Sequence, residues 1–232
     1  MKEEQVTQTA SSDLRQLTPL GRKIESGSFQ VIDNEVGPHA FGPEAWQIVR
    51  RVIHCTADFE YKELMRFCND PIDSGVSALA TGAPILLDVR MIEAGLNRSR
   101  LEHYGCATHC FISDPDVIAD AKQANSTRAV MAMRKAHRLG LVDGAIIAVG
   151  NAPTSLLELK RLVLEEGAKP GLIIGVPVGF ISAAESKAEI QSIPVPSIVS
   201  WGRKGGSPIA VSIIHALMYI ATDRQSKKET LS

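Results

Sequence analysis

Several features that mark large classes of protein are missing from this sequence of 232 residues. It has no excess of positive charge, with 25 Lys and Arg against 26 Asp and Glu, whereas nucleic-acid-binding proteins are typically basic. Its longest mostly apolar run, residues 171–184, is interrupted by glycine and proline and is shorter than the roughly 20 residues that a membrane-spanning helix needs. We therefore expect neither nucleic acid nor a membrane to be a partner.

Cysteine and aromatic residues are also scarce. Four cysteines make a thin disulfide framework for a chain that can build its own core, so a reducing compartment is expected. The first twenty residues carry charges and lack the apolar segment of a secretory signal, which together with the few cysteines predicts a cytoplasmic location. Aromatic residues are only 5% of the chain, which suits closely packed strands and helices better than a β-sandwich.

What the sequence does contain is a repeated alternation of short apolar runs and longer helical stretches. Apolar runs typical of strands buried on both faces predict strands at residues 84–89, 106–112, 144–149, 171–176 and 197–201. Helical patterns, several with a proline near the start, predict helices at residues 43–57, 74–80, 115–123, 126–139, 153–166, 181–189 and 208–221. This order predicts one α/β domain with a doubly wound, mostly parallel sheet and helices on both faces.

The two ends of the chain depart from this pattern. Residues 1–18 are polar and lack periodicity, which predicts a disordered lead-in. Residues 222–232 are rich in charge and predict a solvated polar tail. The single domain is therefore expected to span residues 19–221.

Three glycine-rich loops follow predicted strands, at residues 150–154, at 177–180 with 183–187, and at 202–208. In open parallel sheets, ligands bind in the crevice outside the carboxyl ends of the strands. Glycine lets backbone amides approach an anion, and Arg203 and Lys204 supply positive charge. The loops therefore predict a site for a carboxylated or phosphorylated small molecule. Alternatively, they contain glycine and proline only because crossover turns require them.

The signatures of common cofactor sites are absent. No GxGxxG sequence follows a predicted strand and no GxxxxGK[ST] sequence occurs, which counts against a dinucleotide site and a P-loop. No GxSxG sequence occurs either, so an α/β-hydrolase is not expected. We expect no bound cofactor.

His54 is a candidate for acid–base chemistry, because it lies near the end of the predicted helix 43–57 and imidazole exchanges protons near neutral pH. Arg50 and Arg51, one turn earlier, are expected to disfavour its protonated form unless carboxylates intervene. Alternatively, His54 only binds a final carbonyl of the helix. Cys55 is not expected to act with His54 as a nucleophile, because adjacent residues on a helix do not face each other.

Other polar groups are ambiguous. Four residues of metal-ligand type lie close together in the sequence, namely His103, Cys106, His109 and Cys110. Alternate side chains of a strand point to opposite faces, so we expect no metal site there. Arg128 either binds a carboxylate or is a solvated side chain at the start of a helix, and residues 97–100 form either an anion-binding loop or a solvated turn.

Seven strings occur in order along the chain: IESGSF at 24–29, RVIH at 51–54, GAPI at 82–85 with Asp88, NSTR at 125–128, AVGNAPT at 148–154, GVPVGF at 175–180 with AAESK at 183–187, and GRKGGS at 202–207. Together they resemble the precorrin-8X methylmutase family, which includes the cobalt-precorrin-8 methylmutases of corrin biosynthesis. The resemblance runs from about residue 19 to residue 220. One departure is Cys55, where family members often carry Ala or another small residue.

The resemblance implies an isomerase that moves a methyl group between adjacent carbons of ring C of a tetrapyrrole macrocycle. The product would be hydrogenobyrinic acid or its cobalt counterpart, cobyrinic acid. It also implies a flavodoxin-like sheet and a homodimer with the substrate near the subunit interface. The family's catalytic histidine corresponds to His54, which is expected to place a proton on the macrocycle. Such a shift needs no redox cofactor, which agrees with the missing motifs.

Because such a substrate carries many carboxylates, we expect some residues within these strings to bind them. We expect contacts from Arg128, Lys187, Arg203, Gly179, Gly205 and Gly206, with Ser26 and Ser207 as weaker candidates. Although the net charge is −1, we also expect one positive cluster around the strand-end cleft, with acidic residues on the outer helices. Its members would be Arg50, Arg51, Arg128, Lys187, Arg203 and Lys204.

Two other functions remain open. A tetrapyrrole carrier would bind the same macrocycle without converting it. A flavodoxin-like signalling or nucleotide domain would retain a flavin or a nucleotide. Within the enzyme interpretation, the sequence does not distinguish a metal-free substrate from a cobalt-containing one.

Overall fold

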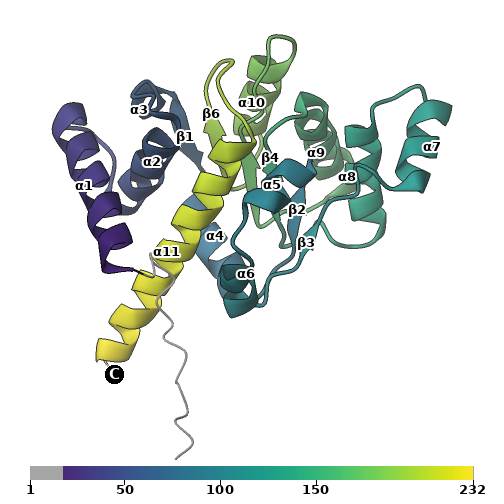
Figure 1. The fold of residues 1–232 in the computed structure, drawn as a ribbon. Helices are drawn as coiled ribbons and strands as arrows, with labels where there is room; N and C mark the ends of the chain where they lie inside the picture. The colour runs from purple at the N-terminus through teal and green to yellow at the C-terminus, as the bar shows by residue number, and fades with distance from the viewer. Residues whose placement is uncertain (1–17, 232) are drawn as a thin grey trace, which may run out of the picture.

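A computed structural model describes residues 18–231, so the predicted lead-in lies outside the described residues except for Thr18. The chain forms one sheet with helices on both sides (Figure 1). In chain order, the described elements are α1 (Pro19–Val36), α2 (Pro43–Thr56), α3 (Tyr61–Leu64), β1 (Met65–Cys68), α4 (Pro71–Ala80), β2 (Ile85–Leu87), α5 (Arg90–Gly95), α6 (Arg98–Tyr104), β3 (Thr108–His109), α7 (Pro115–Gln123), α8 (Arg128–Arg138), β4 (Ile146–Val149), α9 (Pro153–Glu166), β5 (Leu172–Gly175), α10 (Ala183–Gln191), β6 (Ser197–Ser200) and α11 (Ser207–Leu231).

The sheet has the strand order β1-β6-β5-β4-β2-β3. β1 is antiparallel to β6, and every other neighbouring pair is parallel. When the parallel strands are numbered among themselves, their order is 2-1-3-4-5, which is the flavodoxin-like order. The predicted α/β domain with a doubly wound, mostly parallel sheet is confirmed.

Two apolar layers cover the two faces of the sheet. Ile146 and Ala148 of β4 pack into a core with residues of α1, α2, α4, α5, α6 and α11. Ile147 and Val149 pack on the opposite face with residues of α8, α9 and α10. Successive side chains of a strand point to opposite faces, so a strand covered on both sides must be apolar at every position. This is why the central strands are recognisable as short continuous apolar runs.

The edge strands agree less well with the sequence prediction. β1 is not among the predicted strands, because it alternates between buried Met65 and exposed Arg66 at the sheet edge and has no continuous apolar run. β3 has two residues, Thr108 and His109, where a strand at residues 106–112 is predicted. The edges of a sheet have fewer neighbours, so their sequences carry a weaker signal.

α1 is a second element that the apolar pattern does not reveal. Its buried residues are Ile32 and Val36, both in its last turns. Its ends carry ordinary signals, because the Thr18 hydroxyl accepts a hydrogen bond from the Gly21 amide at 3.0 Å and Gly37 follows the last turn with a φ of 64°. α1 is held by its packing on α2 rather than by a strong apolar face of its own.

α11 continues through Leu231, although the sequence pattern predicts its end at residue 221. Its added turns are fixed by Arg224, which binds Glu44 of α2 and Asp73 of α4 at 2.5 and 2.6 Å. The residues expected to form a separate polar tail therefore extend a helix, and most of them are exposed on it. Within residues 18–231, no helix combines the length and the apolar character needed to cross a membrane.

Candidate functional site

The loops after β5 and β6 form one unit at the carboxyl edge of the sheet. The Gly206 amide donates to the Val176 carbonyl at 2.7 Å, and the Gly179 amide donates to the Arg203 carbonyl at 3.1 Å. A Cβ atom at Gly205 would lie 2.3 Å from the Val176 carbonyl oxygen, so only glycine fits at this position. Contrary to expectation, the amides of Gly179 and Gly206 are used between the loops and do not point at a ligand.

The loop after β4 is occupied by a carboxylate of the chain itself. Asp88, just after β2, is fully buried and accepts hydrogen bonds from the amides of Gly150, Asn151 and Ala152 at 3.0, 2.8 and 2.7 Å. Burial raises the pKa of Asp88, and the three amide hydrogen bonds oppose that shift. β2 and β4 flank the point where the strand order reverses, at which flavodoxin-like proteins bind their ligands. The amides that would bind a phosphate there are therefore already used, which argues against a nucleotide domain.

Lys187 of α10 does not reach the surface, contrary to the expectation that it contacts a substrate carboxylate. Its exposed fraction is 0%, and its ammonium donates to the carbonyls of Pro177 and Lys204 at 3.0 and 2.9 Å. Burial lowers the pKa of Lys187 to about 8. The AAESK string thus places a positive charge inside the molecule, beneath the two paired loops.

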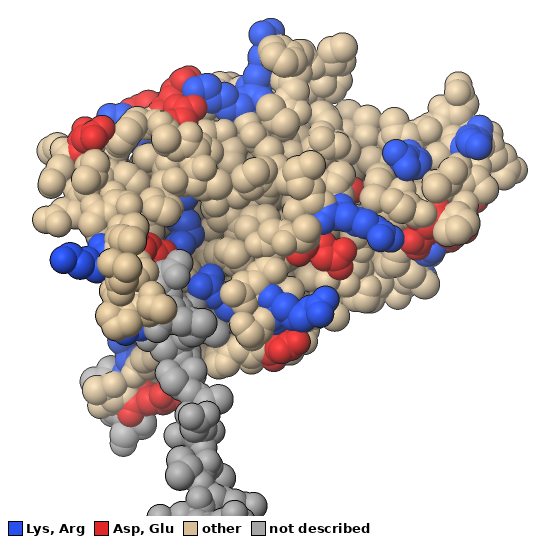
Figure 2. All heavy atoms as spheres, viewed as in Figure 1, with Lys and Arg blue, Asp and Glu red and all other residues tan. Residues whose placement is uncertain are grey.

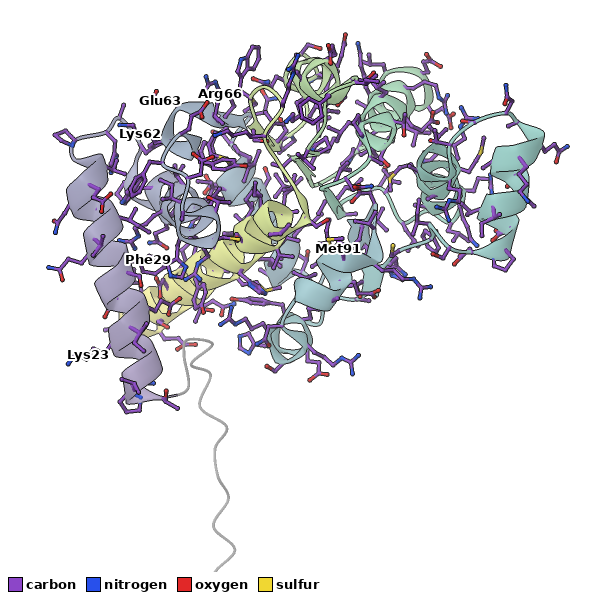
Figure 3. All side chains as sticks on the ribbon, turned by 45° about the horizontal axis from the view of Figure 1, so that its top comes forward. Lys23, Phe29, Lys62, Glu63, Arg66 and Met91 are labelled. Atoms are coloured by element: carbon purple, nitrogen blue, oxygen red, sulfur yellow. The ribbon has the colours of Figure 1, made fainter. Side chains whose placement is uncertain are left out.

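One face of α2 carries the candidate acid–base residue together with two cations. Gln47 precedes Arg50 and Arg51 by three and four residues, and His54 follows Arg51 and Arg50 by three and four, which places these residues along the same side of the helix. Phe29 of α1 lies against this face, on the side of α1 that points to α2 (Figure 3). Its ring centre is 5.2 Å from that of His54 and 4.5 Å from the Arg50 guanidinium. His54 itself is exposed in the last turn of α2.

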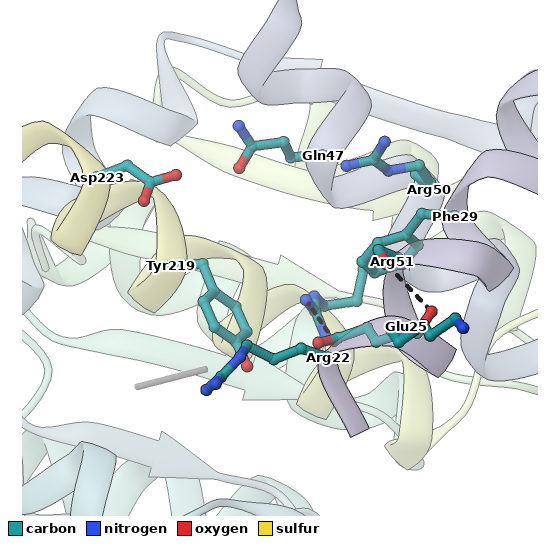
Figure 4. Close-up of a pocket in the computed structure, with 10 residues that line it drawn as sticks. Arg22, Glu25, Phe29, Gln47, Arg50, Arg51, Tyr219 and Asp223 are labelled. Atoms are coloured by element: carbon teal, nitrogen blue, oxygen red, sulfur yellow. Dashed lines mark hydrogen bonds and ion pairs between the residues drawn. The ribbon is translucent and has the colours of Figure 1, made fainter. Parts of the chain in front are cut away.

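A cavity of about 460 Å³ opens along this face, between α1, α2 and α11 (Figure 4). It is lined by Arg22, Lys23, Glu25, Ser26, Phe29, Gln47, Arg50, Arg51, Tyr219 and Asp223. Ser26, a weaker substrate-binding candidate, is among these residues, and its hydroxyl donates to the Lys23 carbonyl at 3.1 Å. His54 is not among the lining residues, but it lies one helical turn beyond the arginines and its ring contacts Phe29, which lines the cavity, so it stands at the rim and not inside.

Carboxylates compensate both arginines of α2. Arg50 binds Asp33 at 2.7 Å, and Arg51 binds Glu25 at 3.2 Å. The Arg51 guanidinium also lies 4.4 Å from the centre of the Tyr219 ring. These partners partly neutralise the positive charge that the sequence places one turn before the histidine.

The cavity and the strand-end loops meet beside His54. The Cys55 sulfur lies 3.7 Å from the Pro208 carbonyl in the first turn of α11. Lys204, in the loop after β6, binds Asp58 just beyond the end of α2 at 2.5 Å. The end of α2 that carries the histidine is therefore fixed against the loop after β6.

The remaining predicted substrate contacts lie in different places. Arg203 is exposed on the loop after β6, with its guanidinium 5.7 Å from the centre of the Phe180 ring. Ser207 is buried at the start of α11. Arg128 is exposed at the start of α8, beside a separate cavity of about 410 Å³, and α8 and α2 lie on opposite sides of the molecule (Figure 1).

The expected single cluster of positive charge does not form within one chain. Arg50 and Arg51 line the cavity, Arg128 lies beside another cavity and Lys187 is buried. Figure 2 shows Lys and Arg distributed over the visible face, with acidic residues next to several of them. The prediction is wrong because the fold places the elements that carry these cations apart and buries Lys187; in addition, Lys204 and both arginines of α2 are bound by carboxylates.

Three residues that shape the cavity are not among the predicted site residues, namely Phe29, Gln47 and Tyr219. Gln47 has a detectable signal, because it lies seven residues before His54 and hence on the same face of one helix. Tyr219 comes from the distant α11, and no local pattern relates it to α2. Its ring is positioned by tertiary packing, with its hydroxyl accepting a hydrogen bond from Arg100 of α6.

The cysteines and potential metal ligands form no further centre. All four cysteines are free thiols. Burial raises the pKa of Cys106 to about 11, so this thiol stays protonated at neutral pH. In the part of the chain that the structure describes, no three His, Cys, Asp or Glu residues are placed to hold one metal ion.

The fold and these residues define an α/β protein with a histidine at the rim of an arginine-lined cavity, next to the carboxyl edge of its sheet. A sequence model of one family, described as precorrin-8X methylmutase, matches residues 23–220. The chain belongs to this family, and it is therefore a methylmutase, an isomerase that transfers a methyl group within one molecule.

Individual relatives agree with this assignment over nearly the whole chain. The cobalt-precorrin-8 methylmutase of Leptospira interrogans is 53% identical over 217 residues, which cover 91% of this chain and 99% of that protein. The cobalt-precorrin-8 methylmutase of Priestia megaterium is 47% identical over 210 residues, which cover 90% and 92% of the two chains. The crystal structure of precorrin-8X methylmutase from Thermus thermophilus superposes with a TM-score of 0.83 at 48% identity, covering 88% of this chain and 97% of that one.

Proposed function

We propose that the substrate is precorrin-8X or cobalt-precorrin-8, and that the enzyme moves a methyl group between adjacent ring-C carbons to give hydrogenobyrinic acid or cobyrinic acid. The observation that carries this proposal is the family match over residues 23–220, combined with an exposed histidine at the rim of a cavity. A methyl shift around a conjugated ring is redox-neutral, so it consumes no redox cofactor. The free thiols support the expected reducing, cytoplasmic location.

His54 is proposed as the proton donor. Its imidazole is exposed, and Phe29 contacts it edge-on, with 5.2 Å between the ring centres and 60° between their planes, which restrains its orientation. A macrocycle bound across the cavity rim can receive a proton from this ring, which lowers the barrier to migration of the methyl group, and a proton returns from the macrocycle to the imidazole afterwards because substrate and product are isomers. Carboxylates of such a substrate would add negative charge close to the imidazole and favour its protonated form.

The carboxylates of the macrocycle are proposed to bind the cations that remain accessible around His54. Arg203 is exposed on the adjoining loop, and its stacking on Phe180 presents a charged plane beside an apolar ring. Arg50 and Arg51 line the cavity with side-chain exposures of 24% and 19%. Each already has one carboxylate partner, so a substrate carboxylate would share or displace that partner.

A homodimer with the substrate near the subunit interface is proposed from the same family resemblance. Arg128 lies in one of the family strings at the start of α8, and α8 lies on the far side of the chain from α2 (Figure 1). A symmetric dimer buries the same surface patch of both chains, so Arg128 can reach the partner's substrate only where that patch extends from the end of α2 to the start of α8. We expect such a patch to bring Arg128 of a second copy to a substrate that is bound beside His54.

The names of similar proteins bear on whether the substrate contains cobalt. The proteins from Leptospira interrogans and Priestia megaterium are named for cobalt-precorrin-8, whereas the Thermus thermophilus structure is named for precorrin-8X. The identity to the Leptospira interrogans protein, 53%, exceeds the 48% identity to the Thermus thermophilus protein, which favours cobalt-precorrin-8 as the substrate of this chain. Comparing turnover of the two purified substrates by the same preparation tests this choice.

A corrinoid carrier is the second candidate function, because a carrier would use the same cavity and the same cations. Incubation of the purified protein with precorrin-8X or cobalt-precorrin-8 separates the two. An isomerase changes the conjugation of the macrocycle, so the visible absorption spectrum should convert to that of the product with many turnovers per chain. A spectrum that never changes, despite measurable binding, would identify a carrier.

A further inference from the structure

Lys187 is the largest side chain that is fully buried in the described part of the chain, and its charge has an unusual set of partners. Its ammonium donates to the Pro177 carbonyl at 3.0 Å, to the Lys204 carbonyl at 2.9 Å and to the Ser200 hydroxyl at 3.4 Å. The Ser200 hydroxyl in turn donates to the Lys204 carbonyl at 2.8 Å. The partners are neutral oxygens, so this is not a buried ion pair.

A buried ammonium is costly unless its hydrogen bonds are well satisfied. Burial also lowers the pKa of Lys187 to about 8, which still leaves most of it protonated at neutral pH. A side chain that only filled space would be apolar at this position, because an apolar chain of similar volume carries no desolvation cost. We therefore look for the role of Lys187 in the hydrogen bonds between its ammonium and the three acceptor oxygens.

Those oxygens come from two segments that are far apart in the sequence. Pro177 belongs to the loop after β5, whereas Ser200 and Lys204 belong to the end of β6 and the loop that follows it. Charge-assisted hydrogen bonds are about twice as strong as neutral ones, so one ammonium that reaches both segments is an effective connection. It adds to the direct bonds between the loops, which are made by the amides of Gly179 and Gly206.

The connected loops carry an exposed arginine and continue into the contact beside His54. Arg203 projects from the loop after β6, where its guanidinium stacks on Phe180 of the neighbouring loop. The same loop leads into α11, whose Pro208 carbonyl contacts Cys55 beside His54. A shift of this loop would therefore displace both the accessible arginine and the contact next to the histidine.

We propose that Lys187 is a positioning residue, whose buried ammonium holds the loops after β5 and β6 together and thereby fixes Arg203 and the start of α11 relative to His54. Lys187 acts through backbone and hydroxyl oxygens and does not touch the substrate. Its connection of the loops is independent of the reaction, whereas its effect on turnover rests on the proposed function.

The test replaces Lys187 by methionine, which keeps the length of the side chain and removes the charge. Lys160→Met is the matched control, because Lys160 pairs with Glu189 of α10 at the surface, where neither strand-end loop is involved. Ser200→Ala is a milder second variant that keeps the ammonium and removes one of its acceptors. Amide hydrogen exchange of Gly179 and Gly206 in the free protein reports on the loops, and kcat and KM for the tetrapyrrole report on the site.

In Lys187→Met, exchange at Gly179 and Gly206 should be at least tenfold faster, while the amides of β4 keep their protection. KM should rise about tenfold and kcat should change less than threefold, because the displaced arginine binds substrate and donates no proton. Ser200→Ala should show the same pattern to a smaller extent, and Lys160→Met should match the wild type.

Unchanged exchange at both glycines in Lys187→Met would overturn the connection between the loops. Faster exchange with an unchanged KM would overturn the proposal that Lys187 positions the substrate-binding groups through these loops. If Lys187→Met does not fold, Ser200→Ala decides the question, and wild-type exchange in that variant contradicts the proposal. If the wild type itself does not convert the tetrapyrrole, the proposed function fails, while the exchange comparison still decides whether Lys187 holds the loops.

Discussion

His54 and His215 lie near the same cavity, but their surroundings suit them to different tasks. His54 is exposed at the end of α2, where a ligand can reach it. His215, four residues before Tyr219 on α11, accepts a hydrogen bond from the Asn97 amide at 3.2 Å. Burial lowers the pKa of His215 to about 4, with smaller contributions from Arg100 and Arg51. His215 is therefore neutral at neutral pH and is not suited to be the proton donor.

The lowered pKa of His215 predicts a specific loss of stability in acid. Between its ordinary value of 6.5 and about 4, the unfolded chain binds a proton that the folded chain does not bind. The stability that the folded protein gains from keeping His215 neutral is fully present above pH 6.5. It is lost as the pH falls towards 4, which lowers the free energy of unfolding by up to about 3 kcal/mol. His215→Gln keeps an acceptor for the Asn97 amide and does not titrate, so urea unfolding from pH 7 to pH 4 should show a shallower decline in this variant. Parallel declines in the two proteins would contradict this assignment.

Individual residues show what a sequence string can and cannot predict. His54 is predicted from a string that resembles a family string; the structure places it at an exposed position, and its role in proton transfer stays a prediction. Lys187 was also found from a string, yet its burial reverses the expected role, because a motif gives the residue type and not its accessibility. Asp88 stood in a matching string without an assigned task, and only the fold shows that it binds the amides after β4.

Among the elements and their connections, the loops after β5 and β6 leave no room for a side chain at Gly205. A Cβ atom at Gly205 would approach the Val176 carbonyl oxygen to 2.3 Å, which neither backbone segment can relieve without moving. In contrast, a Cβ atom at Gly27, on the exposed side of α1, meets nothing within 4 Å. The two glycines therefore have opposite expected responses to the same substitution.

Gly205→Ala should lower the free energy of unfolding by about 1–3 kcal/mol, because the added methyl group overpacks the contact between the loops. Gly27→Ala should raise it by up to about 1 kcal/mol, because alanine loses less backbone entropy in a helix than glycine does. Urea unfolding midpoints of the two variants and the wild type measure both effects. A wild-type midpoint for Gly205→Ala would show that the loops are not closely packed.

The central elements were predictable, and the peripheral ones were not. β4, β5 and β6 are buried on both faces, so each is a continuous apolar run in the sequence. β1 lies at the sheet edge with one side less covered, and α1 contributes few apolar residues, so neither has a strong period. The signals that do mark α1 in the sequence are those of its ends, namely the N-cap at Thr18 and the glycine at Gly37.

At the scale of the whole molecule, the open question is how Arg128 and His54 can serve one substrate. α8, which begins with Arg128, and α2, which carries His54, lie on opposite sides of the chain, and the cations that line the two cavities form separate groups. The net charge of −1 follows from the residue counts alone, and in the structure both arginines of α2 pair with carboxylates. Sequence strings do not give the positions of their residues in space, which is why the predicted cluster was wrong while the fold was right.

The proposed homodimer predicts that two inactive variants restore each other's activity. If each site takes His54 from one chain and Arg128 from the other, His54→Asn and Arg128→Ala chains that are unfolded and refolded together form mixed dimers with one intact site. An equal mixture should recover about one quarter of wild-type activity, because about half of the dimers are mixed and each has one of two sites intact. Each variant refolded alone should stay inactive, and sedimentation should give twice the mass of the chain. No recovery in a confirmed dimer would show that Arg128 does not join the site of its partner.

His54 is proposed to give the proton that allows the methyl group to migrate. The most direct measurement is the rate at which enzyme-bound substrate changes its visible spectrum in a single turnover, compared among the wild type, His54→Asn and Cys55→Ala. His54→Asn should bind the substrate with little change in affinity but convert it at least about 100-fold more slowly, since a general acid contributes about 10²–10⁴ in rate. Cys55→Ala, which changes the adjacent residue on α2, should convert it at the wild-type rate. A wild-type rate in His54→Asn, with the substrate bound, would contradict the account.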